Sequence, residues 1–480
     1  MREGIHLYVN LKNLDSIVED AQKHGDIRKV FYSVDLYFEG LESWVKNCCP
    51  KSVHIEKLTG SRIHFVFEAS ESSRIAPFFW DAVDYAQCLL MELNKSSKLD
   101  SLNADYELNM GADFGSFVRS PINHKGITED NSIGNPANRA AKIQALAPAG
   151  YLWISSDLKF FLEPSLPKSI SILMDPRSPL MLKYGIDSLY QIGLADVAAF
   201  LRDQGTLLAQ RSNPFERFQD NLTETNLSKY SPVPIDSSFV FGKSTRNPKH
   251  IKSGYVLYCD IRGSTKLVAD SANKDMLPAL VKGIMDHIYQ MVDAVLDNGL
   301  SHVQVQGDRE SAMLVVGNAI TAARSILACA FAMLGVSFQR FFEGLNISAE
   351  KFPLSVGVGI AYGSFYRSSV GASFQPDNLL LGTVVNWADE AEDEGAKTPN
   401  SIALTPAAFK TLTSVGDPTL TSVVKKAFEP TPDNRFYVSK VTMQGYRRLV
   451  AEAQQERNAA SAASNGDRPW AAPHADNTDA

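Results

Sequence analysis

The chain has 480 residues, of which 44% are hydrophobic and 21% are charged, and its formal net charge is −7. These values exclude an intrinsically disordered, collagen-like or coiled-coil protein, and the length predicts two or three globular domains. The negative net charge argues against a nonspecific nucleic-acid-binding protein.

Cysteine content and hydropathy indicate the compartment. The five cysteines show no CxxC spacing of the kind that binds zinc, and their odd number argues against a disulfide scaffold. The N-terminus lacks the features of a signal peptide, and no window reaches the roughly 18 apolar residues of a membrane span. We therefore expect a cytoplasmic protein that binds neither membrane nor nucleic acid.

The sequence contains an internal repeat. GADFGSFVRS (111–120) recurs as GIAYGSFYRS (359–368), with six identities in ten residues and an offset of 248. Three further blocks recur in the same order at offsets of 247 to 250: 7–13 with 257–263, 54–67 with 302–315, and 133–142 with 381–390. A nearly constant offset over four blocks predicts a tandem duplication.

Both repeats have the same predicted order of elements. In the second repeat a strand at 254–260 is followed by an amphipathic helix at 277–295 and by a hairpin whose turn is Gly307–Asp308. A helix at 319–334 and a strand at 353–363 complete it. The βαββαβ order predicts an α+β protein with two tandem ferredoxin-like domains, in which the first strand ends beside the hairpin turn.

Composition sets the expected domain boundaries. A stretch rich in Asn, Ser, Thr and Pro separates the repeats, and the last thirty residues contain no Ile, Leu, Val or Phe. We expect a first domain at 1–195, a connector at 196–250, a second domain at 251–447 and a disordered tail at 448–480.

Two carboxylates are predicted to meet in the second domain. Asp260 ends the first strand and Asp308 occupies the hairpin turn. Neighbouring carboxylates repel each other, and a divalent cation held by oxygen ligands relieves that repulsion. The spacing alone is equally compatible with two unrelated aspartates in surface turns.

The residues around these aspartates carry a family resemblance. YCDIRGSTKL (258–267) and VQGDRESAML (305–314) resemble the two metal-binding motifs of the class III nucleotidyl cyclases, with Ser264 where that family usually has Phe. IGNPANRAAK and LGTVVNWADE resemble the family's G-D-x-V-N-x-A-x-R block. The resemblance covers 1–195 and 251–447, and it implies an enzyme that makes a 3′,5′-cyclic nucleotide and pyrophosphate from a nucleoside triphosphate.

In this family the active site is shared between two domains, which implies a division of labour here. The first repeat has Asn10 and Ser61 where the second has Asp260 and Asp308. The resemblance implies that two Mn²⁺ or Mg²⁺ ions are held by residues of the second domain, namely Asp260, the Ile261 carbonyl and Asp308. The functional unit is then a monomeric pseudo-dimer with one composite site.

The first domain would supply the remaining groups of that site. The resemblance implies base recognition by Lys57 and Asn131, transition-state stabilisation by Asn138 and Lys142, and a phosphate contact from Lys183. Taken singly, Lys57 also suits a solvated strand, Asn138 a helix cap, and Lys142 an exposed surface. The second repeat has Glu390 at the position of Lys142, so the opposite site lacks both metal ligands and a cation.

The residues leave the base open. Lys57 and Asn131 together could read adenine, cytosine or uracil, whereas the Glu and Cys typical of guanylate cyclases are absent. The layout without a sensory domain, together with Ser264, is similar to the pyrimidine cyclases of bacterial antiphage defence, whose cyclic CMP or cyclic UMP activates an effector. An adenylate cyclase and a catalytically dead nucleotide-binding module remain the alternatives.

Overall fold

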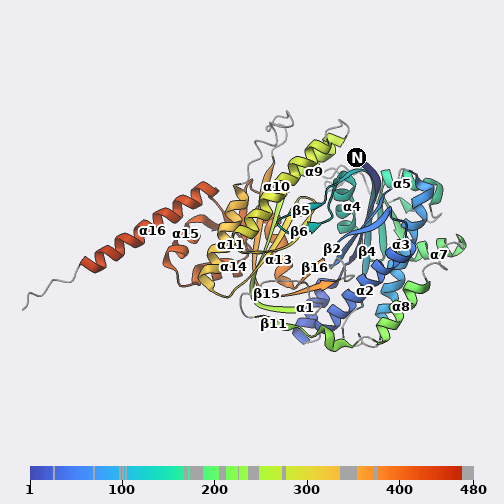
Figure 1. Ribbon diagram of the computed structural model, residues 1–480, viewed down its shortest axis with the longest axis horizontal. Coiled ribbons are helices and arrows are strands. Elements are labelled where there is room, and N and C mark those ends of the chain that lie inside the picture. Colours follow the sequence, from blue (N-terminus) through green and yellow to red (C-terminus); the bar gives the residue numbers. More distant parts are fainter. Residues whose placement is uncertain are drawn as a thin grey trace, which may run out of the picture.

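The computed structural model describes residues 1–24, 27–68, 71–96, 99, 102, 105–166, 171–172, 188–204, 212–224, 226–235, 248–272, 277–335, 354–370 and 377–466. Two units that each combine a sheet with helices lie side by side (Figure 1). The first half of the chain, in blue to green, forms one unit, and the second half, in yellow to red, forms the other.

The first unit is built on the sheet β2-β3-β1-β4-β8-β10-β9. Its strands are β1 (Arg2–Leu11), β2 (Val53–Thr59), β3 (Arg62–Glu68), β4 (Leu108–Arg119), β7 (Ser132–Gly134), β8 (Tyr151–Ser155), β9 (Ser171–Ile172) and β10 (Leu189–Gly193). Its helices are α1 (Leu14–His24), α2 (Ile27–Cys48), α3 (Ser72–Asn94), α4 (Asn135–Leu146) and α5 (Ser156–Leu162).

The second unit repeats this plan on the sheet β13-β14-β12-β15-β17-β19-β18. Its strands are β12 (Lys249–Arg262), β13 (Ser301–Gln306), β14 (Arg309–Val315), β15 (Ser355–Val370), β16 (Asp377–Leu381), β17 (Ser401–Leu404), β18 (Phe428–Pro430) and β19 (Tyr437–Ser439). Its helices are α9 (Ser264–Ala272), α10 (Leu277–Asp297), α11 (Ala319–Leu334), α13 (Thr383–Gly395), α14 (Pro406–Ser414) and α15 (Pro418–Ala427). The predicted α+β fold with two tandem domains is confirmed.

A glycine repeated in both halves explains part of the sequence repeat. A Cβ on Gly111 of β4 would lie 2.1 Å from the backbone nitrogen of Gln144 in α4. A Cβ on Gly359 of β15 would likewise lie 2.1 Å from the backbone nitrogen of Glu392 in α13. Each helix therefore packs directly on its strand, and this close approach requires glycine at both positions.

The two halves exchange segments across their interface. The small hairpin of β5 (Ile122–His124) and β6 (Ile127–Glu129) and the strand β7 that follows it belong to the first half. Ile122 of the hairpin and Ile133 of β7 are nevertheless buried in the hydrophobic core of the second half. In return Tyr366, Leu379 and Leu381 are buried in the core of the first half. These exchanged segments fix the relative position of the two sheets, so a site between them can be built from both.

The expected connector carries regular structure. Helix α7 (Leu194–Gln204) packs on α3, and α8 (Ser212–Glu224) packs on α2 through the buried side chain of Phe218. The segment then runs through β11 (Val233–Ile235), which pairs in parallel with β12. Phe215, Phe218 and Leu222 follow a helical spacing that the polar composition around them obscured.

The expected disordered tail is helical over its first part. Helix α16 (Met443–Gly466) projects from the second half, in red in Figure 1. Tyr446 stacks on Phe331 with 4.1 Å between ring centroids, and Ala453 is 4% exposed. Alanine favours helix without a large buried face, which is why low hydrophobicity did not prevent a helix here. No helix among the described residues is both long enough and apolar enough to span a bilayer.

Candidate functional site

The two expected metal-binding aspartates lie together at one end of the second sheet. Asp260 is near the end of β12, and strand pairing places it opposite Arg309, the first residue of β14. Asp308 directly precedes Arg309 in the turn that joins β13 to β14. The fold therefore brings the two carboxylates into the neighbourhood that the strand order predicts.

The environment of Asp308 fits a divalent cation. Burial and the nearby charge of Asp260 raise the pKa of Asp308, while a hydrogen bond with Ser264 opposes that rise. Asp308 Oδ2 is buried and has no hydrogen-bond partner in the structure. A buried, unpaired carboxylate oxygen beside a second carboxylate is stabilised by a cation that takes oxygen ligands.

The turn after β12 holds the third expected ligand. Ile261 is buried, and its carbonyl oxygen accepts a hydrogen bond from Ser264 Oγ at 2.9 Å. Gly263 has a φ of +89°, in the left-handed region that favours glycine, which lets the chain turn directly into α9. The Ser264 hydroxyl thus contacts both the Ile261 carbonyl and the Asp308 carboxylate, in place of the family's usual Phe.

A third acidic residue, which sequence reasoning missed, lies beside Asp260. Glu392 of α13 is 2% exposed, and burial and the charge of Asp260 raise its pKa. Arg262 links them, with its Nη1 3.4 Å from Asp260 Oδ2 and its Nη2 paired with Glu392. In the parts of the chain that are described, no set of three or more His, Cys, Asp or Glu residues is arranged to hold a metal. The contact with Arg262 assigns Glu392 to an ion pair.

The equivalent positions in the first half form a neutral network. Ser61 Oγ donates to Asn10 Oδ1 at 2.6 Å, and Asn10 Nδ2 donates to Asn109 Oδ1 at 2.9 Å. Gln144, the counterpart of Glu392, donates from its Nε2 to the same Asn109 oxygen at 3.0 Å. Amides and a hydroxyl that satisfy one another create no demand for a cation, which supports the expected loss of metal binding. The acid-to-amide difference between Glu392 and Gln144 is a sequence signal that could have identified Glu392.

Helix α4 of the first half faces the aspartate hairpin. Asn138 Nδ2 lies 3.4 Å from Thr265 Oγ1 in α9, and a Cβ added at Gly307 would lie 3.7 Å from Asn138 Oδ1. Lys142 follows one helical turn later, on the same face of α4, and is exposed. The structure therefore places Asn138 beside the Asp308 turn, and Lys142 lies one turn further along α4.

Asn131 contacts the same turn through backbone groups. Its Nδ2 donates to the Gly307 carbonyl oxygen at 2.9 Å, and the Gly307 N–H donates to its Oδ1 at 3.1 Å. Asn131 is 1% exposed. The predicted base-reading amide is thus engaged with the hairpin that carries Asp308.

Lys57 is part of a buried ion-pair network between the halves. Its Nζ lies 3.2 Å from Glu129 Oε2, and Glu129 Oε1 lies 2.7 Å from His302 Nε2 in the second half. His302 Nδ1 in turn lies 2.7 Å from Glu310 Oε1. Burial opposes ionisation of Glu129, but Lys57 and His302 outweigh it and lower its pKa to about 2. Sequence reasoning missed Glu129 and His302, because neither stands in a recognised motif.

His302 gives the fold a predictable pH dependence. Burial favours neutral His302, but Glu310 and Glu129 outweigh burial and raise its pKa from 6.5 to about 10. The folded state therefore holds this proton more tightly than the unfolded state, and the resulting stabilisation is complete below pH 6.5 and lost toward pH 10. We expect the melting temperature of His302→Gln to be lower than that of the wild type near pH 7 and to change less on raising the pH. Circular-dichroism melts with parallel pH profiles for both proteins would contradict this assignment.

Lys183, the predicted phosphate contact, lies outside the described residues. The other predicted site residues lie on both sides of the interface between the halves: Lys57, Asn131, Asn138, Lys142, Asp260, Ile261 and Asp308. Asp260, Ile261 and Asp308 belong to the end of β12 or to the turn after β13. Asn131 and Asn138 make hydrogen bonds to Gly307 and Thr265, which lie in or beside these turns. Lys57 pairs instead with Glu129, and Lys142 lies on α4.

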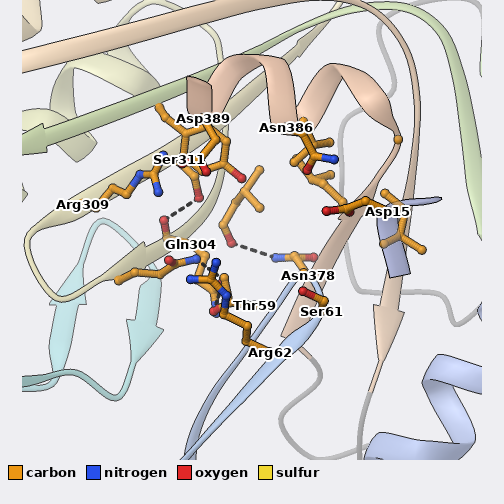
Figure 2. A pocket seen from close by; sticks show the side chains of 18 of the residues that line it. Asp15, Thr59, Ser61, Arg62, Gln304, Arg309, Ser311, Asn378, Asn386 and Asp389 are labelled. Carbon is orange, nitrogen blue, oxygen red and sulfur yellow. Dashed lines mark hydrogen bonds and ion pairs between the residues drawn. The ribbon is translucent and has the colours of Figure 1, made fainter. Parts of the chain in front are cut away.

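A cavity of about 320 Å³ lies at the pseudo-equivalent position on the opposite side of the interface (Figure 2). Ser61 and Arg62 line it from the first half, and Asn386, Asp389 and Arg309 line it from the second. It therefore combines Ser61, the counterpart of Asp308, with Asn386, the counterpart of Asn138. Arg309 forms an ion pair with Asp389 within it.

Comparisons with known proteins give a family match for the second half. Residues 247–446 match the family described as the adenylate and guanylate cyclase catalytic domain. An adenylate cyclase from Anabaena cylindrica is 26% identical over 201 residues, which are 41% of this chain and 36% of the relative. The chain thus matches little more than a third of that relative's length.

A solved structure resembles nearly the whole chain. It is a class III adenylyl cyclase-like ATP-binding protein from Pseudomonas aeruginosa, with a TM-score of 0.70 and 16% sequence identity. The match covers 94% of this chain and 90% of that one. At this identity the similarity shows a shared fold that extends over both halves.

Proposed function

We propose that the chain is a nucleotidyl cyclase with one composite site, on the premise that residues 247–446 match the adenylate and guanylate cyclase catalytic domain family. The observation that carries the proposal is the pairing of Asp260 with Asp308, whose buried Oδ2 has no partner. Asn138 of the other half contacts α9 beside this pair. The second half carries the acidic pair and the first half carries the Asn138 amide. Such a complementary distribution is expected for a shared active site, whereas nucleotide binding without catalysis does not require it.

The proposed reaction is an intramolecular phosphoryl transfer. The ribose 3′-oxygen bonds to the α-phosphorus, the bond to the β-phosphate oxygen breaks, and the products are a 3′,5′-cyclic nucleotide, pyrophosphate and the hydroxyl proton. Asp260, Asp308 and the Ile261 carbonyl would hold Mn²⁺ or Mg²⁺, which lowers the pKa of the hydroxyl and neutralises triphosphate charge.

The first half would stabilise the charge that develops. The Asn138 amide and the Lys142 ammonium lie one turn apart on α4 and both donate hydrogen bonds, as negative charge on the transferring phosphate requires. Lysine keeps the charge that arginine would supply but cannot form a bidentate pair with phosphate. We assign Lys183 to the triphosphate and Lys57 to the side of the site that faces the base.

We propose more narrowly that the base is a pyrimidine, so that the product is cyclic CMP or cyclic UMP and activates an effector in bacterial antiphage defence. The support is the absence of a guanylate-type Glu and Cys pair and the presence of Ser264 beside Asp308. An adenylate cyclase is the second candidate, because the Anabaena relative carries that name.

The test uses purified full-length protein with Mn²⁺ and each of ATP, GTP, CTP and UTP. Liquid chromatography with mass spectrometry should detect one 3′,5′-cyclic nucleotide, and we expect cyclic CMP or cyclic UMP. Cyclic AMP as the main product would transfer the assignment to adenylate cyclase. Nucleotide binding by calorimetry without any cyclic product would identify a catalytically dead nucleotide-binding module instead.

A further inference from the structure

We infer that Asn131 positions the hairpin that carries Asp308, and that it does so instead of reading the base. The inference rests on the proposed function, since it concerns the metal-binding half of that site. It is carried by the contacts of Asn131 and by a difference between the two halves of the chain.

Both ends of the Asn131 amide are bound to one backbone unit. The side chain donates to the Gly307 oxygen at 2.9 Å and accepts from the Gly307 N–H at 3.1 Å, so it pairs with Gly307 as a neighbouring strand would. Its own carbonyl oxygen accepts from the Ser120 N–H at 2.7 Å, which fixes the backbone of Asn131. With 1% of the residue exposed, a base has no access to this amide.

A second contact from the same segment holds the hairpin two residues earlier. Glu129 Oε2 accepts a hydrogen bond from the Val305 N–H at 2.9 Å. Residues 129 and 131 therefore hold residues 305 and 307, with the same spacing on both segments. Because Asp308 follows Gly307 directly, this double attachment determines where the Asp308 carboxylate lies.

The counterpart position in the other half carries no such amide. The counterpart of Asn131 is Leu379, which has no hydrogen-bonding side chain and is buried in the first hydrophobic core. The counterpart hairpin, with Gly60 and Ser61 at its turn, lines the 320 Å³ cavity. The amide that holds the turn is therefore present beside the hairpin that carries Asp308, and it is replaced by Leu379 at the counterpart position. This distribution is expected if the amide serves to position Asp308.

The test compares Asn131→Ala and Asn131→Asp with the wild type, and uses Asn109→Ala as the matched control. Asn109 is also 1% exposed and hydrogen-bonded through its amide, but it contacts Gln144 and Ala147 rather than the hairpin. Hydrogen exchange measured by mass spectrometry reports the hairpin peptide that contains Gly307. We expect its exchange to become about ten-fold faster in Asn131→Ala and to stay at the wild-type rate in Asn109→Ala.

Steady-state kinetics separate positioning from base reading. In Asn131→Ala we expect the Mn²⁺ concentration for half-maximal activity to rise about ten-fold, whereas the ratio of kcat/KM between the best and second-best nucleotide stays unchanged. Asn131→Asp should be intermediate, because a carboxylate still accepts from the Gly307 N–H but cannot donate to its oxygen. A changed nucleotide ratio at constant Mn²⁺ dependence, or unaltered exchange of the hairpin, would overturn the inference. If the wild-type protein makes no cyclic nucleotide, the proposed function fails, and the exchange measurement still decides whether Asn131 holds the hairpin.

Discussion

Replacing Asp308 by Asn should reduce cyclic-nucleotide formation by on the order of 10³-fold, because the substitution removes one of the two charges that would hold the metal ions. Asp260→Asn should cause a loss of the same order. The initial rate of product formation with saturating Mn²⁺ and the preferred nucleotide is the measurement. Asn10→Ala and Ser61→Ala, at the equivalent positions of the first half, should retain activity within a few-fold. Equal losses at both pairs of positions would contradict a single composite site.

Stability distinguishes lost chemistry from lost folding in the same variants. Burial and Asp260 raise the pKa of Asp308 above its ordinary value of 3.8, so the ionised form destabilises the fold once the pH exceeds that value. Asp308→Asn removes this penalty, and its melting temperature near neutral pH should equal or exceed that of the wild type. A clear fall in melting temperature would instead attribute the lost activity to misfolding.

The convergence of Asp260 and Asp308 could be predicted because it depends on local order alone. A strand end and a hairpin turn of the same βαββαβ unit are neighbours in any such fold, and the register of β12 with β14 confirms it. Ser61 and Asn10 were likewise located by repeat offset, and the structure shows them hydrogen-bonded to each other. The repeat showed that a glycine recurs at 111 and 359 but gave no reason for it. The structure supplies the reason, because the helix packs directly on the strand at Gly359.

The partners of Lys57 and Asn131 could not be predicted from the sequence. Glu129 reaches His302 only because a hairpin of the first half packs into the core of the second, and no periodicity reports that arrangement. Asn131 binds the backbone of Gly307, and a backbone group leaves no trace in residue type. The meeting of strand ends within one folding unit was therefore accessible to sequence reasoning, whereas the side-chain partners of Lys57, Asn131 and Glu392 required the structure.

The second large effect is expected from Glu129→Ala, at the centre of the buried network between the halves. Lys57 and Glu129 side chains are 6% and 17% exposed, and His302 is 8% exposed, so solvent screens these charges weakly. Removing Glu129 leaves the Lys57 cation buried without its partner and frees the Val305 N–H. Breaking a buried pair in this way costs about 3–5 kcal/mol, which corresponds to a fall in melting temperature on the order of 10 °C.

Differential scanning calorimetry of the full-length protein measures this effect, and Lys125→Ala is the matched control. Lys125 lies in the same small hairpin and pairs with Asp293 at 2.7 Å, but its side chain is 42% exposed. An exposed ion pair contributes little, so the control should melt with the wild type. We expect the wild type to unfold in a single transition. Because Glu129 joins the two halves, its loss should also separate this transition into two, whereas a uniform shift of one transition would show that the halves remain coupled without it. A melting temperature of Glu129→Ala equal to that of Lys125→Ala would mean that the hydrophobic exchange of Ile122 and Ile133 alone holds the interface, and that the charges across it add no stability.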